Sequence, residues 1–121
     1  IAQLPDETFI EGVLDSNEDK GVPHFEVNKD TRWVAQYEPN MNLGFLCYTP
    51  KVISGPNSRA MIWDLARYHK FYYQANTARA MKAGETLDYS VIVKPVENET
   101  GDWAATKAAA AELAKQYPPV N

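Results

Sequence analysis

The chain has 121 residues, of which 45% are hydrophobic and 23% charged, and its formal net charge is -4 at pH 7. This size and balance are typical of one folded domain with a single core and exclude a disordered chain. The acidic charge offers no basic field to a phosphate backbone, so we expect no nucleic-acid partner. No apolar run approaches the ~20 residues of a membrane helix, so we also expect no membrane span.

The single cysteine, Cys47, excludes an intramolecular disulfide framework and leaves the cellular compartment open. Leu46 and Tyr48 flank it in an apolar run, so we expect a small buried residue and not a nucleophile. The sequence begins with Ile1 and not with Met, which indicates a processed or excised piece.

Hydrophobic residues alternate with a period of two up to about residue 95, which predicts a mainly β chain. Residues 8–14 alternate moderately, and a polar cluster at 15–21 predicts a turn after them. Residues 22–27 and 31–38 flank the polar break at 28–30, a pattern typical of a β-hairpin.

Trp33 and Ala35 should share one face of the strand at 31–38 while Val34 faces the other way, so both faces carry apolar side chains. Residues 39–44 predict a turn. Further strands are expected at 45–49, 60–63, 68–74 and 86–93.

The segment 50–57 contains two prolines and a glycine, which suits a connection between sheets. Residues 64–67 are also compatible with a helical turn. A turn at 83–85 precedes the strand at 86–93, which has the cleanest alternation in the chain.

Residues 102–117 predict a C-terminal α-helix, because seven alanines supply high helix propensity and two prolines follow. Asp102 suits the N-terminal cap, and Lys115 lies near the negative end of the helix dipole. An apolar stripe recurs at spacings of three and four: Trp103, Thr106, Ala110, Leu113 and Tyr117. This stripe should lie on the sheet or on a partner chain. The fold class predicted is an antiparallel β-sandwich with this helix, in a single domain spanning residues 1–121.

The segment 59–74 gathers five aromatic residues, one histidine and three basic residues. Flat ring faces beside hydrogen-bond donors suit a polyhydroxylated or planar ligand, so we expect a saccharide to bind here. The ligand-binding candidates are Trp63, Tyr68, Lys70, Tyr73 and Arg59. The alternative is that these rings build the core between two sheets, since large aromatic side chains are often buried.

Strand alternation divides this segment into two sets: Tyr68, Lys70 and Tyr72 on one face, and His69, Phe71 and Tyr73 on the other. Only one set can face a cleft. The catalytic candidates are His69 as acid or base, Tyr72 as a proton-abstracting phenol, and Arg67 as a stabiliser of negative charge. A structural histidine is the alternative.

Four residues follow the spacing of a calcium loop: Asp15, Asn17, Asp19 and Glu26. Gly21 lies one position later than the sharp turn of such a loop requires, so a solvated turn is favoured. His24 and Glu26 lie two apart on one face of a strand and could pair with the distant His69 as metal ligands. Nothing in the sequence confirms His69 as the third ligand, so polar side chains that face solvent are the favoured interpretation. We expect no metal and no cofactor; glycine-rich phosphate loops and paired-cysteine zinc signatures are also missing.

Three segments together resemble the C-terminal part of a galactose-mutarotase-like β-sandwich: Arg32–Pro39, Leu43–Pro50 and Lys82–Thr86. That superfamily includes aldose epimerases and the sandwich domains of polysaccharide-processing enzymes such as lyases. The resemblance covers roughly residues 31–94. It implies carbohydrate handling within a larger sugar-active enzyme and a periplasmic or secreted location. No position matches the catalytic histidine or the late catalytic glutamate of the epimerases.

Carbohydrate binding or processing is therefore the function that we expect, with a saccharide as the partner. Two alternatives remain open at this point. One is a non-catalytic interaction domain that uses its terminal helix against a partner chain or in an oligomer. The other is a small carrier that holds an apolar molecule between its sheets.

Overall fold

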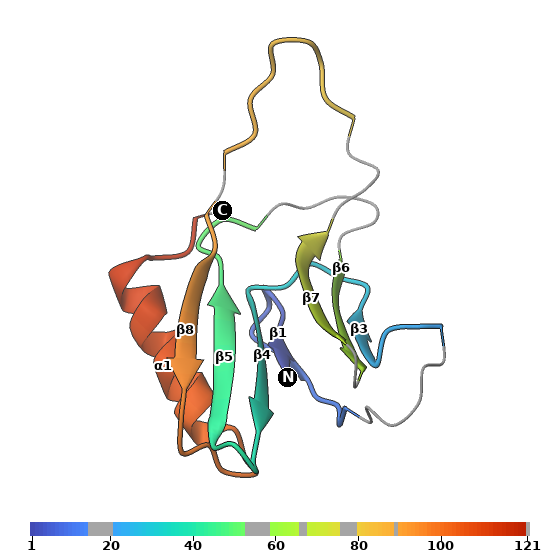
Figure 1. Ribbon diagram of the computed structural model, residues 1–121. Helices are drawn as coiled ribbons and strands as arrows, with labels where there is room; N and C mark the ends of the chain where they lie inside the picture. Colours follow the sequence, from blue (N-terminus) through green and yellow to red (C-terminus); the bar gives the residue numbers. More distant parts are fainter. Residues whose placement is uncertain (15–20, 53–58, 66–67, 76–79, 89, 121) are drawn as a thin grey trace.

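The computed structural model describes residues 1–14, 21–52, 59–65, 68–75, 80–88 and 90–120, with the backbone alone at Leu65, Tyr68, His69, Gln74 and Ala75. These residues form eight strands and one helix (Figure 1). The strands are β1 (Ala2–Gln3), β2 (Phe9–Ile10), β3 (Phe25–Val27), β4 (Trp33–Glu38), β5 (Leu43–Tyr48), β6 (Arg59–Leu65), β7 (Tyr68–Ala75) and β8 (Ile92–Val96). The helix α1 spans Ala104–Gln116.

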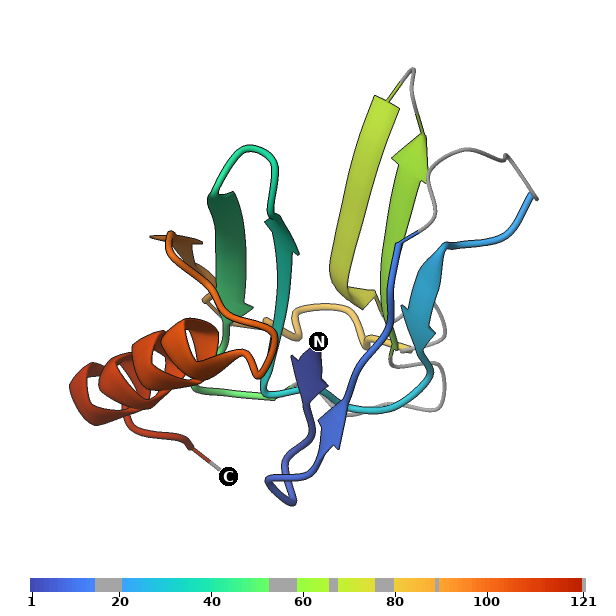
Figure 2. The same ribbon diagram turned by 90° about the horizontal axis from the view of Figure 1, so that it is seen from below.

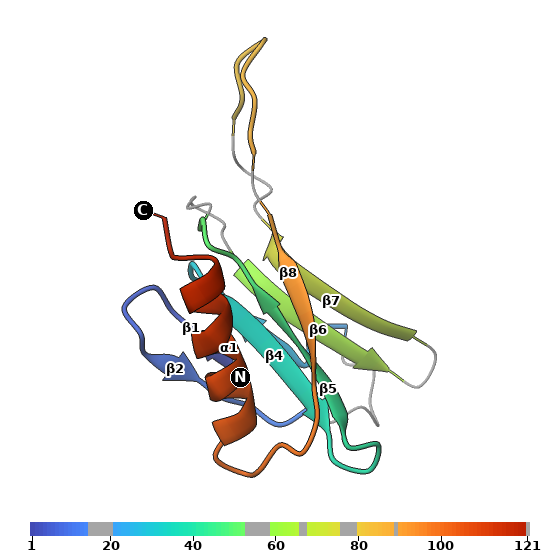
Figure 3. The ribbon, with the colours of Figure 1, turned by 90° about the vertical axis from the view of Figure 1, so that its left-hand side faces the viewer.

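The strands make two antiparallel sheets, one of five strands in the order β2-β1-β4-β5-β8 and one of three in the order β3-β6-β7. Helix α1 lies on the face of the five-stranded sheet that points away from the smaller sheet (Figures 2 and 3). The predicted fold class, a mainly β antiparallel sandwich with a C-terminal helix, is therefore confirmed.

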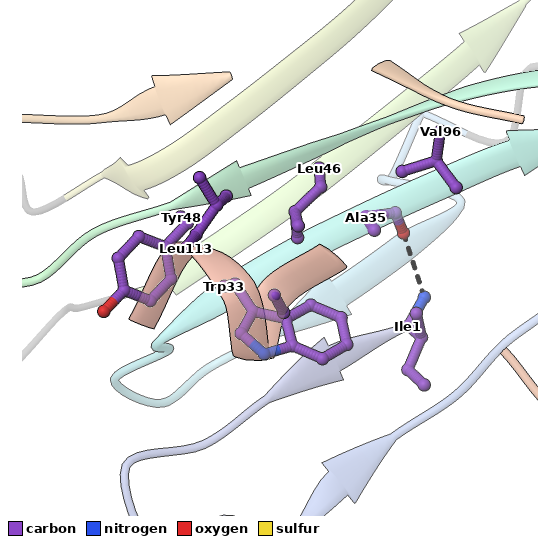
Figure 4. Packing of buried hydrophobic residues seen from close by; sticks show 8 residues of the cluster. Ile1, Trp33, Ala35, Leu46, Tyr48, Val96 and Leu113 are labelled. Carbon is purple, nitrogen blue, oxygen red and sulfur yellow. Dashed lines mark hydrogen bonds between the residues drawn. The ribbon is translucent and has the colours of Figure 1, made fainter. Parts of the chain in front are cut away.

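One hydrophobic cluster lies between α1 and the five-stranded sheet (Figure 4). Trp33 and Tyr48 are direct partners across β4 and β5, and both rings are almost fully buried. Leu113 and Ala110 of α1 pack against this sheet face. Each fully buried large side chain of this kind contributes about 1.5–3 kcal/mol, so this contact anchors the helix. The amide of Ala35 and the carbonyl of Ile1 extend the β1–β4 pairing at 2.9 Å.

A second cluster lies between the two sheets and holds the sandwich together. Val34 of β4 and Ile62 of β6 both belong to it, and Phe71 and Tyr73 of β7 pack against it. Val34 is buried here while its neighbour Trp33 is buried under α1. The prediction that both faces of the strand at 31–38 carry apolar side chains is thus confirmed.

The helix begins two residues later than predicted, at Ala104, and its N-cap residue is Trp103 in a left-handed conformation. Asp102 still serves the helix, because its carboxylate accepts a hydrogen bond from the Ala104 amide at 3.1 Å. Glu99 caps the next amides, those of Ala105 at 3.2 Å and Thr106 at 2.5 Å. A carboxylate at this end of a helix is stabilised by the free amides and the dipole.

The predicted apolar stripe of α1 packs on the chain's own sheet through Thr106, Ala110 and Leu113. Trp103 is half-buried beside them. Tyr117 is the exception, with 46% of its surface exposed. Its carbonyl, one residue beyond α1, accepts a hydrogen bond from the Tyr48 hydroxyl at 2.7 Å.

The expected hairpin between 22–27 and 31–38 is wrong, because these segments belong to different sheets. β3 pairs with β6, whereas β4 pairs with β1 and β5. The intervening residues carry the chain from one sheet to the other, and Thr31 is buried in this crossing. A short polar break can mark a crossing from one sheet to another as well as a hairpin turn, and the local sequence pattern does not distinguish the two.

The expected strand at 86–93 is also wrong over most of its length. Regular pairing begins only at Ile92, where β8 joins β5, and residues 80–88 form an arm that projects away from both sheets (Figures 1 and 3). Its tip is the predicted turn, with Gly84 at φ 81. A half-buried strand needs alternating apolar and polar residues, but such alternation does not ensure that a strand forms. Among the described residues, no strand pairs with the part of the segment 86–93 that precedes Ile92.

Smaller differences concern the ends of elements. The expected strand at 8–14 is reduced to β2, and the pairing of β1 with β2 and β4 was not predicted. The residues 64–65 continue β6, so the first half of the possible helical turn is strand, and residues 66–67 lie outside the described part. Most of the connection at 50–57 also lies outside it.

Candidate functional site

The predicted site lies on β6, the middle strand of the three-stranded sheet, and on β7, which pairs with it at the edge of this sheet. Trp63 pairs directly with Lys70, and Met61 pairs directly with Tyr72. Directly paired residues in an antiparallel sheet point to the same side, and so do residues two apart in one strand. These four side chains therefore share one face, which we call the outward face because Ile62 and Phe71 turn the other way, into the core between the sheets.

The outward face combines ring surface with positive charge. Tyr72 is 41% exposed, Lys70 is exposed and Trp63 is half-exposed. Trp63 and Tyr72 are diagonal neighbours across the two strands, a relationship that separates residues by about 7–8 Å. Two ring systems at this spacing, with an ammonium group next to the indole, can contact one ligand of a few rings.

Arg59 extends the same face toward β3. Its guanidinium lies 3.5 Å from the carboxylate of Glu26, and their side chains are 41% and 31% exposed. Glu26 pairs with Met61 in the register of β3 and β6, which puts it on the outward face. A half-exposed ion pair of this kind contributes little to stability, so both groups are available to donate to or accept from a ligand at small cost.

Tyr73 belongs to the opposite face from Tyr72. It is half-buried against the cluster between the sheets, and its hydroxyl donates a hydrogen bond to the Arg32 carbonyl at 2.7 Å. Phe71, also on this side, contacts the ring of Phe45 with 5.0 Å between centroids. The predicted binding set is thus divided: Tyr73 joins sheet packing, as the core alternative expects, while the other described members lie outside.

Two of the three catalytic candidates, His69 and Arg67, have side chains outside the described part of the structure. His69 pairs with Asp64 through the backbone and Tyr68 pairs with Leu65, but their side chains lie outside the described part of the structure, as does all of Arg67. Tyr72 is described and lies on the outward face. The grouping of these candidates into one catalytic constellation stays a prediction.

His24 and Glu26 have other partners than a metal. The Nδ1 atom of His24 accepts a hydrogen bond from the Asp64 amide at 3.1 Å, and Glu26 pairs with Arg59. Among the described residues, no group of three or more His, Cys, Asp or Glu side chains is arranged to hold a metal ion. Three members of the calcium-like spacing, at 15–19, lie outside the described ranges.

Sequence reasoning did not indicate two hollows that described residues line. The larger, which we call the inter-sheet cleft, has a volume of 770 Å³. Its walls come from both sheets, from the segment 12–14 and from the β4–β5 turn; Phe25, Ile62, Phe45 and Val93 are representative. None of the predicted site residues is among the described residues that line it. Its members are scattered from one end of the sequence to the other, so no local pattern marks them.

The smaller hollow has a volume of 430 Å³ and lies between β1, β2 and α1. Lys107 of α1 places its ammonium group 4.6 Å from the centre of the Phe9 ring, and Phe9 in turn contacts Trp33 at 5.9 Å between centroids. Arg32 also lines this hollow, but its guanidinium donates to the carbonyls of Thr49 and Pro50. These hydrogen bonds join the residue before β4 to the two residues after β5.

Cys47 is buried in β5, as predicted. Burial raises the pKa of its thiol to about 11, so hardly any thiolate is present at neutral pH. A nucleophilic role is therefore not supported by its surroundings.

The described part of the chain contains no helix with the length and apolarity to cross a bilayer. A scan against protein-family models, a search of curated proteins and a search of solved structures each find no match to this chain. The functional argument therefore depends on the geometry of the surfaces described above.

Proposed function

We propose that this chain is a carbohydrate-binding domain that recognises a saccharide on the outward face of β6 and β7, as part of a larger sugar-active enzyme. The observation that supports this most directly is the direct pairing of Trp63 with Lys70 beside the exposed Tyr72. The rings offer flat apolar surface to the C–H side of a pyranose. The ammonium group, and Arg59 four residues along β6 from Trp63, offer donors to its hydroxyls.

The charge on this face favours an acidic sugar. The whole chain has a net charge of -4, yet among the described residues the outward face carries two cationic side chains, Lys70 and Arg59, and Arg59 is paired with Glu26. A uronate carboxylate next to Lys70 would make a charge-assisted hydrogen bond, which is stronger than one between neutral groups. We therefore expect uronate oligosaccharides to bind better than neutral ones.

The proposal covers binding first. Catalysis of the lyase or epimerase type would need His69 and Arg67 close to the ligand held by Tyr72, whereas strand alternation separates position 69 from position 72. Catalysis therefore stays a separate hypothesis, and binding is what we propose for the outward face. A role in polysaccharide processing would place the protein in the periplasm or outside the cell.

Calorimetric titration with matched uronate and neutral oligosaccharides tests the proposal. An open face with two rings should bind weakly, with a Kd near 1 mM, or about -4 kcal/mol. Tyr72→Ala should weaken binding of both sugars at least about fivefold, because a stacking surface is lost. Lys70→Met should remove the preference for the uronate while keeping the neutral sugar.

Two variants serve as matched controls. Tyr117 is exposed to a similar extent as Tyr72 but lies beyond α1, and Lys82 is an exposed lysine in the projecting arm. Tyr117→Ala and Lys82→Met should leave both affinities unchanged. If no sugar binds, or if Tyr72→Ala binds as the unmodified protein does, the non-catalytic interaction domain becomes the better description.

A further inference from the structure

The smaller hollow, between β1, β2 and α1, combines aromatic walls with two cationic side chains. The rings belong to Phe9, Trp33 and Tyr48. The cationic side chains are those of Arg32 and Lys107. The volume of 430 Å³ lies within the range of about 300–1,000 Å³ that small-molecule sites occupy. The hollow is therefore large enough for an organic molecule with a single ring.

The guanidinium of Arg32 has an edge without an acceptor. It donates from one nitrogen, Nη1, to the carbonyls of Thr49 at 3.3 Å and Pro50 at 2.8 Å. Its other two nitrogens, Nη2 and Nε, have no hydrogen-bond acceptor among the described residues, and no described carboxylate pairs with this half-buried side chain. A guanidinium edge of this kind matches the two oxygens of a carboxylate in a bidentate pair.

Lys107 of α1 is the second cation. Its ammonium group lies 4.6 Å from the centre of the Phe9 ring, and it makes no ion pair with a described carboxylate. Hydrogen bonds from Thr100 and Ala104 lower the pKa of the Asp102 carboxyl, and the charge of Lys107 adds to this effect at longer range. Asp102 therefore already has hydrogen-bond donors of its own and leaves the ammonium group without a direct anionic partner.

The charge of the hollow is positive although the chain is acidic overall. Glu7 is the one acidic residue among the described residues that line it, and its exposed side chain makes no ion pair with Arg32 or Lys107. Burial raises the pKa of the Tyr48 hydroxyl, and the charge of Arg32 opposes this rise, which indicates that Arg32 lies near this ring. Water screens an exposed carboxylate more than it screens half-buried cations, so the hollow attracts an anion.

A buried hydrogen-bond donor also lines the hollow. Only 2% of Trp33 is exposed, and no described residue accepts a hydrogen bond from its indole N–H. Figure 4 shows the nitrogen-bearing ring of this indole on the side nearer to Tyr48, another residue of the lining. A buried indole N–H usually has a partner, because a buried donor without an acceptor is costly. A ligand with an acceptor oxygen would supply this partner.

We propose that the smaller hollow binds a small organic carboxylate that carries one aromatic or alicyclic ring. The unpaired edge of Arg32 holds the carboxylate, and Lys107 adds positive charge beside the ring of Phe9. The ring of the ligand lies against Trp33 and the alanines of α1 that line the hollow. This site shares no described residue with the outward face of β6 and β7, so it stands or fails independently of saccharide binding.

The ring walls favour this ligand over an inorganic anion. Phosphate or sulfate would satisfy the cations but would lose water against the faces of Phe9 and Trp33 without a compensating contact. A ring attached to the carboxylate gains apolar contact with the same faces. The combination of rings and cations therefore favours an anion with an apolar body.

An NMR titration of the isotope-labelled chain with phenylacetate tests the proposal. The indole N–H signal of Trp33 should shift and saturate, and the amide signals of Phe9 and Lys107 should shift with it. Phenylethanol keeps the ring without the charge, and phenylethylammonium reverses the charge; each should bind about tenfold more weakly or worse. Acetate lacks the ring and should also bind about tenfold more weakly or worse.

Two variants and one control locate the site. Arg32→Lys keeps the charge but loses the bidentate edge, and should weaken phenylacetate binding about tenfold. Lys107→Met keeps an unbranched side chain near Phe9 without its charge, and should weaken binding about threefold. Lys115→Met is the matched control: Lys115 is an exposed lysine of the same helix that does not line the hollow, so the affinity should stay unchanged.

Several outcomes would overturn the proposal. Equal affinity for phenylacetate and phenylethanol would mean that the cations play no part in binding. Phenylacetate binding that Lys107→Met does not weaken, or that leaves the Trp33 indole signal in place, would put the site elsewhere. The absence of saturable binding would refute the site altogether. If circular dichroism shows that Arg32→Lys does not fold, the affinity of Lys107→Met and the Trp33 signal decide the question.

Discussion

Replacing Glu99 with alanine should destabilise the protein by about 3 kcal/mol, because one carboxylate holds the start of α1 to the preceding loop. It accepts hydrogen bonds from the Ala105 amide at 3.2 Å and the Thr106 amide at 2.5 Å. It also accepts one from the Thr106 hydroxyl. Thr106 is only 1% exposed, so water cannot easily replace this partner.

The magnitude follows from two contributions. Loss of a capping side chain typically costs about 0.5–2 kcal/mol. A buried hydroxyl left without its partner, here that of Thr106, costs about 1–3 kcal/mol more. A total near 3 kcal/mol corresponds to a fall in Tm of about 10 °C for a chain of this size.

The contribution should also depend on pH. Burial alone would raise the pKa of the Glu99 carboxyl, but the hydrogen bonds from Thr106, Thr100 and Ala105 outweigh burial and lower the pKa below its ordinary value of 4.5. A group whose pKa is lowered by folding stabilises the protein above its unfolded pKa, and this stability is lost as the pH falls through the folded pKa. The difference between the unmodified protein and Glu99→Ala should therefore be complete at pH 7 and shrink below about pH 4.5.

Urea unfolding followed by circular dichroism measures this difference at pH 7 and at pH 3. Glu112→Ala is the matched control, since Glu112 is an exposed residue of α1 with a single ion pair to Lys115 at 3.4 Å. It should change the free energy of unfolding by less than about 0.5 kcal/mol. A Glu99→Ala protein as stable as this control, or a deficit of equal size at both pH values, would refute the reasoning.

Three further predictions concern the sheets and the core. Gly44→Ala should destabilise strongly, by about 3 kcal/mol or more, because a Cβ atom would meet the Gln36 carbonyl oxygen at 2.2 Å; Gly101→Ala, with no atom within 4 Å, should be nearly neutral in the same urea titration. Cys47 should react with a thiol reagent at pH 8 about a hundredfold more slowly than in the unfolded chain, since its pKa is raised from 9.0 to about 11; equal rates would contradict its burial. Leu113→Ala should lower the free energy of unfolding by about 2–5 kcal/mol, and a loss under 1 kcal/mol would mean that α1 is not anchored as described.

Much of this fold could be predicted from local patterns. The alternation of Trp33, Val34 and Ala35 indicated a strand with two apolar faces, and the alanine-rich segment with its terminal prolines indicated α1. Local patterns did not indicate which strands pair with each other when they lie far apart in the sequence. After Val27 the chain passes from one sheet to the other, so β3 and β4 have different pairing partners. The pairing of β3 with β6 joins segments about 35 residues apart.

The candidate site was predictable only in part. Alternation separated Tyr72 and Lys70 from Phe71 and Tyr73, and the structure confirms that the first pair is exposed while the second packs inward. Alternation did not indicate which set faces solvent, because both contain aromatic rings. The inter-sheet cleft was not predictable at all, since its walls come from segments that become neighbours only when both sheets have formed.

The central claim is that the outward face of β6 and β7 binds a saccharide, and an NMR titration of amide signals with an oligogalacturonate tests it most directly. The signals of Met61, Trp63, Lys70 and Tyr72 should shift together and saturate, and the indole N–H of Trp63 should shift with them. Those of the control residue Tyr117 should stay in place. Shifts confined to the lining of the inter-sheet cleft, or no shifts at ligand concentrations well above about 1 mM, would contradict the claim.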